Sequence, residues 1–332
     1  MKTLNALLLL PLLLFSLHAN EEIQTEEPNL FTSKEDGTFD VSEYLGTQYG
    51  FMPVPTIITE PALGYGAGIS LMFLHDTFNS THERKSPPSI SGLFLGGTEN
   101  GTRAAGAFHL GFWKEDTIRS TTFVGAMDVN INFYLRNTGI DMKMKGFFGY
   151  QELMFRLGGS DFFLGANYIY SNVESSRNDT QFPILNPLFE HQFKMAGLAT
   201  ILQYDTRDSI FTPSQGLFAK ATLRRFDENL GGKENFWRYG AKALYFIPAL
   251  RDTLTIGVRV EGESVNAIGD DIVPFFANPS INMRGIPAMR YQGEKMLLSE
   301  LQVRWEFIER WNLVLFDGAG YNGLKNQDNF ST

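Results

Sequence analysis

The side chains that usually perform catalysis or hold metals are sparse in this sequence. Its 332 residues contain no cysteine, which rules out disulfides, thiolate metal sites and thiol nucleophiles. Four histidines lie beyond the N-terminal segment, and no two of them have a metal-ligand spacing: His75, His82, His109 and His191. Neither a Gly-x-Ser-x-Gly elbow nor a His-Glu-x-x-His motif occurs. The sequence therefore predicts neither a metal site nor a cofactor.

A hydrolase with a Ser–His pair could be argued from Ser70 and His109, but only by residue type. The glycines Gly64, Gly66 and Gly68 lie within a predicted strand with no helix after it, so they lack the context of a nucleotide-binding loop. We interpret them as positions where strands coil tightly. The sequence thus favours a protein that is not an enzyme.

One arginine–glycine pair, Arg284-Gly285, stands in an irregular stretch of about 25 residues, longer than most connections. In the segment after it, apolar and polar residues alternate. One set is Leu297, Ser299, Leu301, Val303, Trp305 and Phe307, and the other is Leu298, Glu300, Gln302, Arg304 and Glu306, so Ser299 and Leu298 are the two exceptions. A period of two places these sets on opposite faces of a strand. Such a strand fits a wall between lipid and water, and equally a strand of a soluble sandwich.

Three motifs occur here in the order of one known family. They are Asp205-Thr206-Arg207-Asp208 with Pro213 and Gly216, then Met283-Arg284-Gly285-Ile286, then Glu300 followed by Phe316 and Gly320 on the next strand. These residues resemble the bacterial surface antigen family, the BamA/TamA-type outer-membrane β-barrels, over about residues 191–321. The resemblance implies an antiparallel transmembrane barrel, of sixteen strands in the family. It also implies a role in inserting or secreting proteins, with outer-membrane lipid and client proteins as partners.

The resemblance implies two sites. The first motif is the family's periplasmic hairpin, at Asp205, Arg207, Asp208, Pro213 and Gly216. The second is a loop latch, in which an extracellular loop folds into the barrel and its arginine reaches acids on the next two strands. Here the family's second acid is replaced by Gly318, and Asp317 is displaced by one residue, which points it to the other face. We therefore expect Arg284 to pair mainly with Glu300, with Asp317 as the lesser candidate.

The N-terminal part of the chain predicts export. Residues 1–19 combine Lys2 with an apolar run and Ala19, as in a signal peptide, and residues 20–44 are polar and acidic, as in a flexible periplasmic lead. The lead is too short for the folded periplasmic repeats of the family, the POTRA repeats. The formal charge of −9 and the lack of a basic patch argue against nucleic acid as a partner. These features predict a bacterial outer-membrane protein whose barrel domain spans residues 45–332.

Strand-like segments follow one another through the barrel domain. Twelve candidates lie near residues 63–75, 89–98, 102–113, 118–135, 143–156, 161–172, 191–205, 216–227, 235–247, 253–265, 295–308 and 311–321. Many are near the length that a tilted membrane strand needs, about 9–11 residues. The resemblance implies that the Asp205–Gly216 hairpin is periplasmic and the Arg284 loop extracellular, so the last strand would run outward and the number of strands would be odd. We therefore expect a thirteenth strand, interrupted by proline, near residues 44–58. A chain of 12–13 strands suggests a truncated and unclosed family barrel, and a soluble sandwich is the alternative fold.

The alternation also predicts which side chains face lipid and which face the lumen. Leu254, Ile256, Val258 and Val260 are expected to face lipid. The predicted lumen-lining residues are Asp128, Asn130, Arg259, Glu261 and Arg304. This polar lining allows a second function, a passive outer-membrane channel. A third possibility is a truncated remnant without function.

Overall fold

The computed structural model describes residues 50–76, 88–135, 138–177, 191–250, 253–271, 273–308, 311–324 and 327–331. The predicted signal peptide and lead lie outside these residues, as does His82. The strands are β1 (Gly50–Ile58), β2 (Gly66–Leu74), β3 (Ile90–Thr98), β4 (Arg103–Trp113), β5 (Ile118–Leu135), β6 (Thr138–Arg156), β7 (Phe162–Arg177), β8 (His191–Asp205), β9 (Gly216–Phe226), β10 (Phe236–Ala249), β11 (Leu254–Ala267), β12 (Lys295–Ile308), β13 (Trp311–Leu324) and β14 (Gln327–Ser331). The helical segments among them are two short 3-10 turns, η3 (Glu228–Leu230) and η4 (Phe275–Ala277). None of the described helices is long and apolar enough to span a membrane.

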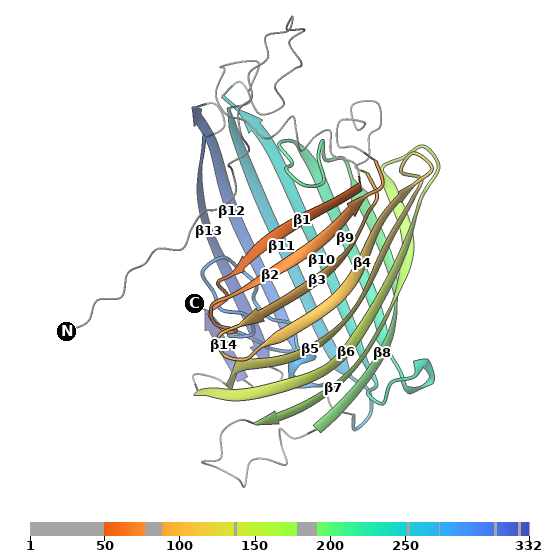
Figure 1. The fold of residues 1–332 in the computed structure, drawn as a ribbon, viewed down its shortest axis with the longest axis vertical. Helices are drawn as coiled ribbons and strands as arrows, with labels where there is room; N and C mark the ends of the chain where they lie inside the picture. The colour runs from red at the N-terminus through yellow and green to blue at the C-terminus, as the bar shows by residue number, and fades with distance from the viewer. Residues whose placement is uncertain are drawn as a thin grey trace, which may run out of the picture. The chain divides into compact units, whose positions relative to one another are not determined.

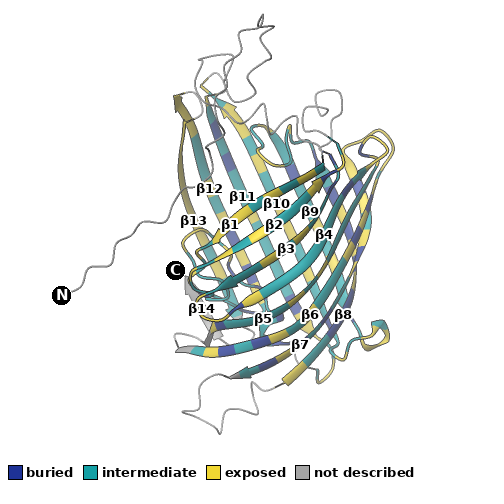
Figure 2. Cartoon of the chain, viewed as in Figure 1, coloured by how far each residue is buried: buried dark blue, intermediate teal, exposed yellow. Residues whose placement is uncertain are grey.

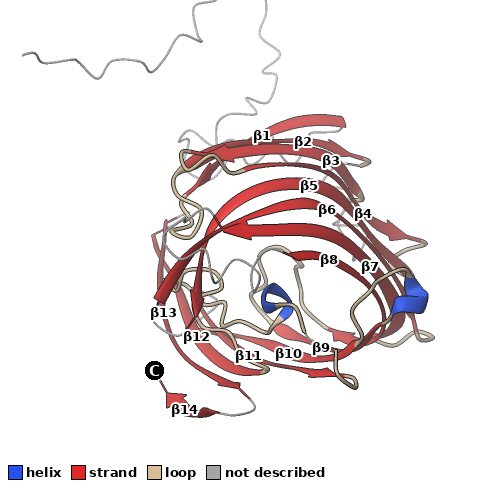
Figure 3. Cartoon of the chain, turned by 90° about the horizontal axis from the view of Figure 1, so that it is seen from below, coloured by secondary structure: helices blue, strands red, loops and turns tan. Residues whose placement is uncertain are grey.

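The strands form one antiparallel sheet in which each strand pairs with its neighbours in the sequence (Figure 1). Seen end-on, the sheet curls around an interior that contains η4 (Figure 3). Between the described residues of β1 and β14 there is no pairing, so the sheet is open. The all-β antiparallel prediction is confirmed.

The expected thirteenth strand is β1, an edge strand in which Pro53 and Pro55 face Leu71 and Ile69 of β2. Proline is tolerated there because an edge strand leaves half of its backbone N–H groups without a partner strand. The expected count of 12–13 strands misses β14. This short polar segment, Gln327–Ser331, pairs with β13 at only three positions and has no alternation of apolar residues that would reveal it.

Alternation along the strands separates two faces. Large apolar side chains are exposed on the convex face, including Leu93, Val124, Leu198, Leu223, Leu297 and Leu301. Exposed positions alternate with more buried ones along the strands (Figure 2). The opposite, concave face carries charged residues and contacts the β11–β12 loop. This distribution is that of a barrel wall between lipid and a polar interior.

Two ends of the barrel are used below as landmarks. The hairpin end holds the β8–β9 connection, residues 206–215, and the loop end holds the β11–β12 connection, residues 268–294. Because neighbouring strands are antiparallel, the β4–β5 and β6–β7 turns also lie at the hairpin end.

Candidate functional site

The β11–β12 loop is tied to itself and to the concave face. Ser280 and Gln292 form an isolated β-bridge, and the backbone N–H of Ile281 donates to the carbonyl of Tyr291 over 2.9 Å. Ile281, 1% exposed, packs with Met296 and Leu298 of β12. The middle of the loop is therefore a short closed hairpin, and its Ile281 side chain packs on apolar residues of the barrel wall.

Two further contacts hold the first half and the tip of the loop. Phe276 packs between apolar clusters on β5–β7 and on β8–β11, and its ring centroid lies 5.1 Å from that of Phe193. The backbone N–H of Ala288 donates to Oε1 of Glu60, in the β1–β2 turn, over 3.0 Å. The loop thus contacts strands from both halves of the sheet.

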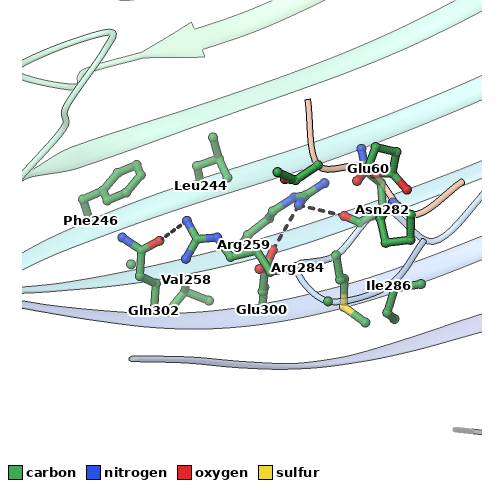
Figure 4. Close-up of a pocket in the computed structure, with 15 residues that line it drawn as sticks. Glu60, Leu244, Phe246, Val258, Arg259, Asn282, Arg284, Ile286, Glu300 and Gln302 are labelled. Atoms are coloured by element: carbon green, nitrogen blue, oxygen red, sulfur yellow. Dashed lines mark hydrogen bonds and ion pairs between the residues drawn. The ribbon is translucent and has the colours of Figure 1, made fainter. Parts of the chain in front are cut away.

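Arg284 lies over the concave face of β12 and β13 (Figure 4). Its Nη2 donates to Oε1 of Gln302 over 2.6 Å, and its guanidinium lies 5.0 Å from the centroid of the Phe316 ring. The expected ion pair with Glu300 is not formed. Glu300 instead accepts a hydrogen bond from Arg259 Nη1 over 3.0 Å, because Arg259 is its direct register partner on β11.

Arg259 nevertheless connects the acid to the loop. Its Nη1 also donates to the backbone carbonyl of Asn282 over 3.1 Å, and its Nη2 contacts Glu261 over 2.6 Å. Glu300 therefore acts on the loop through Arg259. Arg259, Asn282 and Glu300 border a cavity of about 660 Å³ between the loop and the wall, and Glu60 also lines it.

The glycines of β13 explain why the loop approaches so closely. A Cβ on Gly318 would lie 3.0 Å from Met283 Sδ, and one on Gly320 would lie 2.7 Å from Ile281 Cδ1. Asp317 is opposite Leu301 on the convex face, so it is not a partner for Arg284. Where the family carries an acid, this chain therefore provides space for an apolar side chain.

Gly285 is needed for its conformation. Its φ is +81°, and nothing lies within 4 Å of where a Cβ would be. An L-residue there would be strained although space is available.

At the hairpin end, the residues of the first motif share one structure. Asp205 accepts hydrogen bonds from Arg207 Nε over 2.8 Å and Arg119 Nη1 over 2.7 Å. Gly216 has φ +103°, and a Cβ there would lie 2.4 Å from the Thr206 carbonyl. The Pro213 carbonyl accepts from Arg304 Nη2 over 3.1 Å. The hairpin is thus fastened to strands β5 and β12.

Asp208 closes the turn itself. Its carboxylate accepts backbone hydrogen bonds from Ser209 over 2.9 Å and Ser214 over 3.0 Å, and a further one from Gln215. Burial by itself would raise the pKa of Asp208, but the hydrogen bonds from Ser214, Gln215 and Ser209 hold it below its ordinary value.

Comparison with known proteins identifies the family of this barrel. The Omp85 superfamily domain matches residues 103–285, more than half of the chain. The chain belongs to the Omp85 superfamily. It is accordingly a bacterial outer-membrane β-barrel protein of the BamA/TamA type.

A solved structure gives the same fold. The crystal structure of BamA from Haemophilus ducreyi lacking POTRA domains 1–3 aligns with a TM-score of 0.53 and 13% sequence identity. The alignment covers 83% of this chain and 58% of that one, so this chain spans less than two thirds of the length of its structural relative. No curated protein matches.

In this Omp85 barrel, the predicted lumen residues divide between the two faces. Arg259, Glu261 and Arg304 lie on the concave face, as their contacts with the loop and the hairpin show. Asp128 and Asn130 lie on the convex face, so their assignment to the lumen is wrong. Asp128 pairs there with Lys143 over 3.0 Å, and Asn130 contacts Asn100 in the β3–β4 turn.

Contact with the loop explains why Asp128 and Asn130 face outward. β5 extends past the end of β4, which pairs with it only as far as Asp128. The concave positions Met127, Val129 and Ile131 are apolar because they belong to the cluster that contains Phe275 and Phe276 of the loop. Apolar and polar residues do alternate along this part of β5, but the apolar set faces the loop and the polar set faces outward.

The hairpin end contains functional candidates that sequence reasoning missed. Asp116, in the β4–β5 turn, binds Arg119 over 2.6 Å and also Arg156 of β6. Both guanidiniums stack on the buried ring of Phe163, with centroid distances of 4.2 Å and 4.4 Å. Together with the Arg119–Asp205 pair, these contacts join the β4–β5, β6–β7 and β8–β9 turns. Asp116 and Arg156 stand in ordinary-looking turns, so no local pattern identifies them.

The remaining polar candidates are not brought together. Ser70 and His109 lie on opposite faces of the sheet; His109 Nδ1 is 2.8 Å from Ser91 Oγ instead. Among the described residues, no group of three or more His, Asp or Glu side chains could hold a metal ion.

Proposed function

We propose that this Omp85 barrel inserts polypeptides into the outer membrane or secretes them across it, with the β11–β12 loop folded into the barrel as a movable internal segment. The observation that supports this proposal is the placement of the loop. It is anchored to β12 and β13 by Ile281 and Met283, to β11 by Arg259, and to the β1–β2 turn by Glu60. Partners would be outer-membrane lipid and unfolded client proteins.

The proposal is tested by reconstituting the purified chain into lipid vesicles and adding an unfolded outer-membrane barrel as client. We expect the client to become protease-resistant faster than in empty vesicles. The variant with residues 279–292 replaced by a short Gly-Ser linker should lose this acceleration. Equal rates with and without the protein would contradict the proposal.

A passive channel is the second candidate, and the charged lining beside the cavity of about 660 Å³ favours it. Single-channel conductance of the same loop-replacement variant separates the two functions. A barrel occupied by its loop should gain conductance when the loop is removed, whereas a simple pore should change little.

A further inference from the structure

Strands β9 and β10 place four cationic side chains close together on the concave face. Lys220 is the direct register partner of Lys242, and Arg224 is the direct register partner of Arg238. Like charges directly opposite each other on one face of a sheet destabilise the pairing. Two such pairs, four residues apart, need a source of negative charge.

The carboxylates nearby balance only part of this charge. Glu152 lies 2.9 Å from Lys220, and Glu263 contacts Arg238. Glu261 is bound to Arg259 over 2.6 Å. In the part of the chain that the structure describes, neither Arg224 nor Lys242 forms an ion pair.

The two unpaired cations are held by weaker contacts. Arg224 Nη2 donates to Asn167 over 2.8 Å, and its Nε is buried without a hydrogen-bond partner. Lys242 Nζ lies 5.6 Å from the centroid of the Phe218 ring, and its side chain is exposed to the interior of the barrel. A buried guanidinium N–H without an acceptor is unfavourable.

A cavity of about 210 Å³ lies among these residues. All four cations line it, together with Glu261, Glu263 and the Thr222–Gly240 register pair between the two like-charge pairs. Gly240 has no side chain to fill the space, and a Cβ there would meet nothing closer than 3.6 Å. The space is large enough for a tetrahedral oxyanion.

We propose that this cavity is a binding site for a phosphate group. Because Arg259 is already paired with both Glu261 and Glu300, these groups carry one positive charge in excess. A phosphate group would supply the missing negative charge and accept hydrogen bonds from the guanidinium of Arg224 and the ammonium of Lys242, which both line the cavity. Charge-assisted hydrogen bonds of this kind are the strongest in proteins. The group can come from free phosphate or from the headgroup of a phospholipid that enters the barrel.

The test measures the thermal unfolding of the detergent-folded barrel in chloride and in inorganic phosphate at equal ionic strength. Because a ligand that binds only the folded state stabilises it, the melting temperature should rise, by roughly 5 °C at 100 times Kd. Arg224→Gln and Lys242→Gln should each reduce the rise, and the double variant should abolish it. Lys143→Gln, an equal charge change on the convex face, should keep it.

A second readout distinguishes ligand binding from a merely structural role. If Lys242 repels Lys220 when no anion is bound, Lys242→Gln should melt at a higher temperature than the parent chain in chloride. A lower melting temperature would mean that Lys242 stabilises the fold by itself, and would overturn the proposal.

A parallel titration with short-chain phosphatidylglycerol, below its micelle concentration, identifies the source of the group. Stabilisation by this lipid alone, lost in the double variant, assigns the site to headgroups, and stabilisation by both ligands assigns it to any phosphate. Stabilisation by neither, or stabilisation that the double variant retains, overturns the proposal.

Discussion

The two ends of the barrel hold their connections by different means. At the hairpin end, Asp205 and Asp116 are buried and bind three arginines, two of which stack on Phe163. At the loop end, Ile281 and other apolar loop residues fit against the wall and against glycines of β13. One end is fastened by charge, the other mainly by shape.

The difference follows the sequence motifs. In the hairpin motif, Asp205 forms ion pairs with Arg119 and Arg207. In the loop motif, the family's second acid has become Gly318, and Met283 occupies the space beside it. An ion network resists movement because separating its partners leaves desolvated charges, whereas an apolar contact can slide. We infer that the hairpin end is the fixed end and the loop end the movable one.

The largest expected effect is the loss of Asp205. Its side chain is 3% exposed and bound to two arginines, so Asp205→Ala should leave Arg207 without a carboxylate and Arg119 with Asp116 alone, and cost about 3–5 kcal/mol in the free energy of unfolding. Urea unfolding of the detergent-folded barrel measures it. Asp161→Ala is the control, because Asp161 is 52% exposed and 3.7 Å from Arg156. Its loss should cost less than about 1 kcal/mol. Equal costs would remove the distinction between the ends.

Filling the space beside the loop should have the next largest effect. Gly320→Val would push against Ile281 and should cost about 1–3 kcal/mol, as overpacking does. It should also expose the loop to limited proteolysis near Arg284. Adding Ile281→Ala should restore protease resistance. Gly262→Val is the matched control, because a Cβ there meets nothing closer than 3.6 Å. A loop unaffected by Gly320→Val would show that shape does not hold it.

Charge should contribute less at the loop end, and it should act through Arg259. A double-mutant cycle between Arg259→Ala and Glu300→Ala should give a coupling of about 1 kcal/mol, since the two side chains are in contact. The cycle between Arg284→Ala and Glu300→Ala should be additive within about 0.5 kcal/mol. A larger coupling in the second cycle would restore the direct latch.

The smallest expected effect is a pH dependence of the hairpin turn. The pKa of Asp208 is lower in the folded chain than in the unfolded one, because the charged form accepts the hydrogen bonds of the turn. Its contribution is therefore present above the unfolded pKa, about 3.9, and is lost as pH falls through the lower folded value. Acid titration with proteolysis of the hairpin as readout should show this loss. The Asp208→Asn variant should show no such step, and a step that persists in it would assign the effect to another group.

Much of the fold could be predicted from the sequence because alternation is a local property. Residues 297–307 reveal both faces of β12 without any knowledge of its neighbours, and the bounds of β8 and β12 agree with the predicted strands. Alternation does not tell which face is inside. For Asp128 and Asn130, the concave face is apolar because the loop lies on it, and the loop is more than 130 residues away in the sequence.

The site could be predicted only in part, for the same reason. The motifs identified the loop and the hairpin, but the partner of Glu300 depends on the register between β11 and β12, which places Arg259 opposite it. The role of Asp116 likewise depends on three turns meeting in space. Side chains whose partners are set by register and curvature leave no local signal.

The contact between the loop and the concave face of β13 is what sets the loop end apart from the hairpin end, and the absence of cysteine makes this contact simple to measure. The chain carrying Ile281→Cys and Gly320→Cys should form a disulfide readily under mild oxidation, because the side chain of Ile281 lies against Gly320. Ile281→Cys with Asp317→Cys is the control, since Asp317 lies on the convex face. Cross-linking of the first pair and not of the second is the predicted result. No cross-link between positions 281 and 320, or equal yields from both pairs, would contradict it.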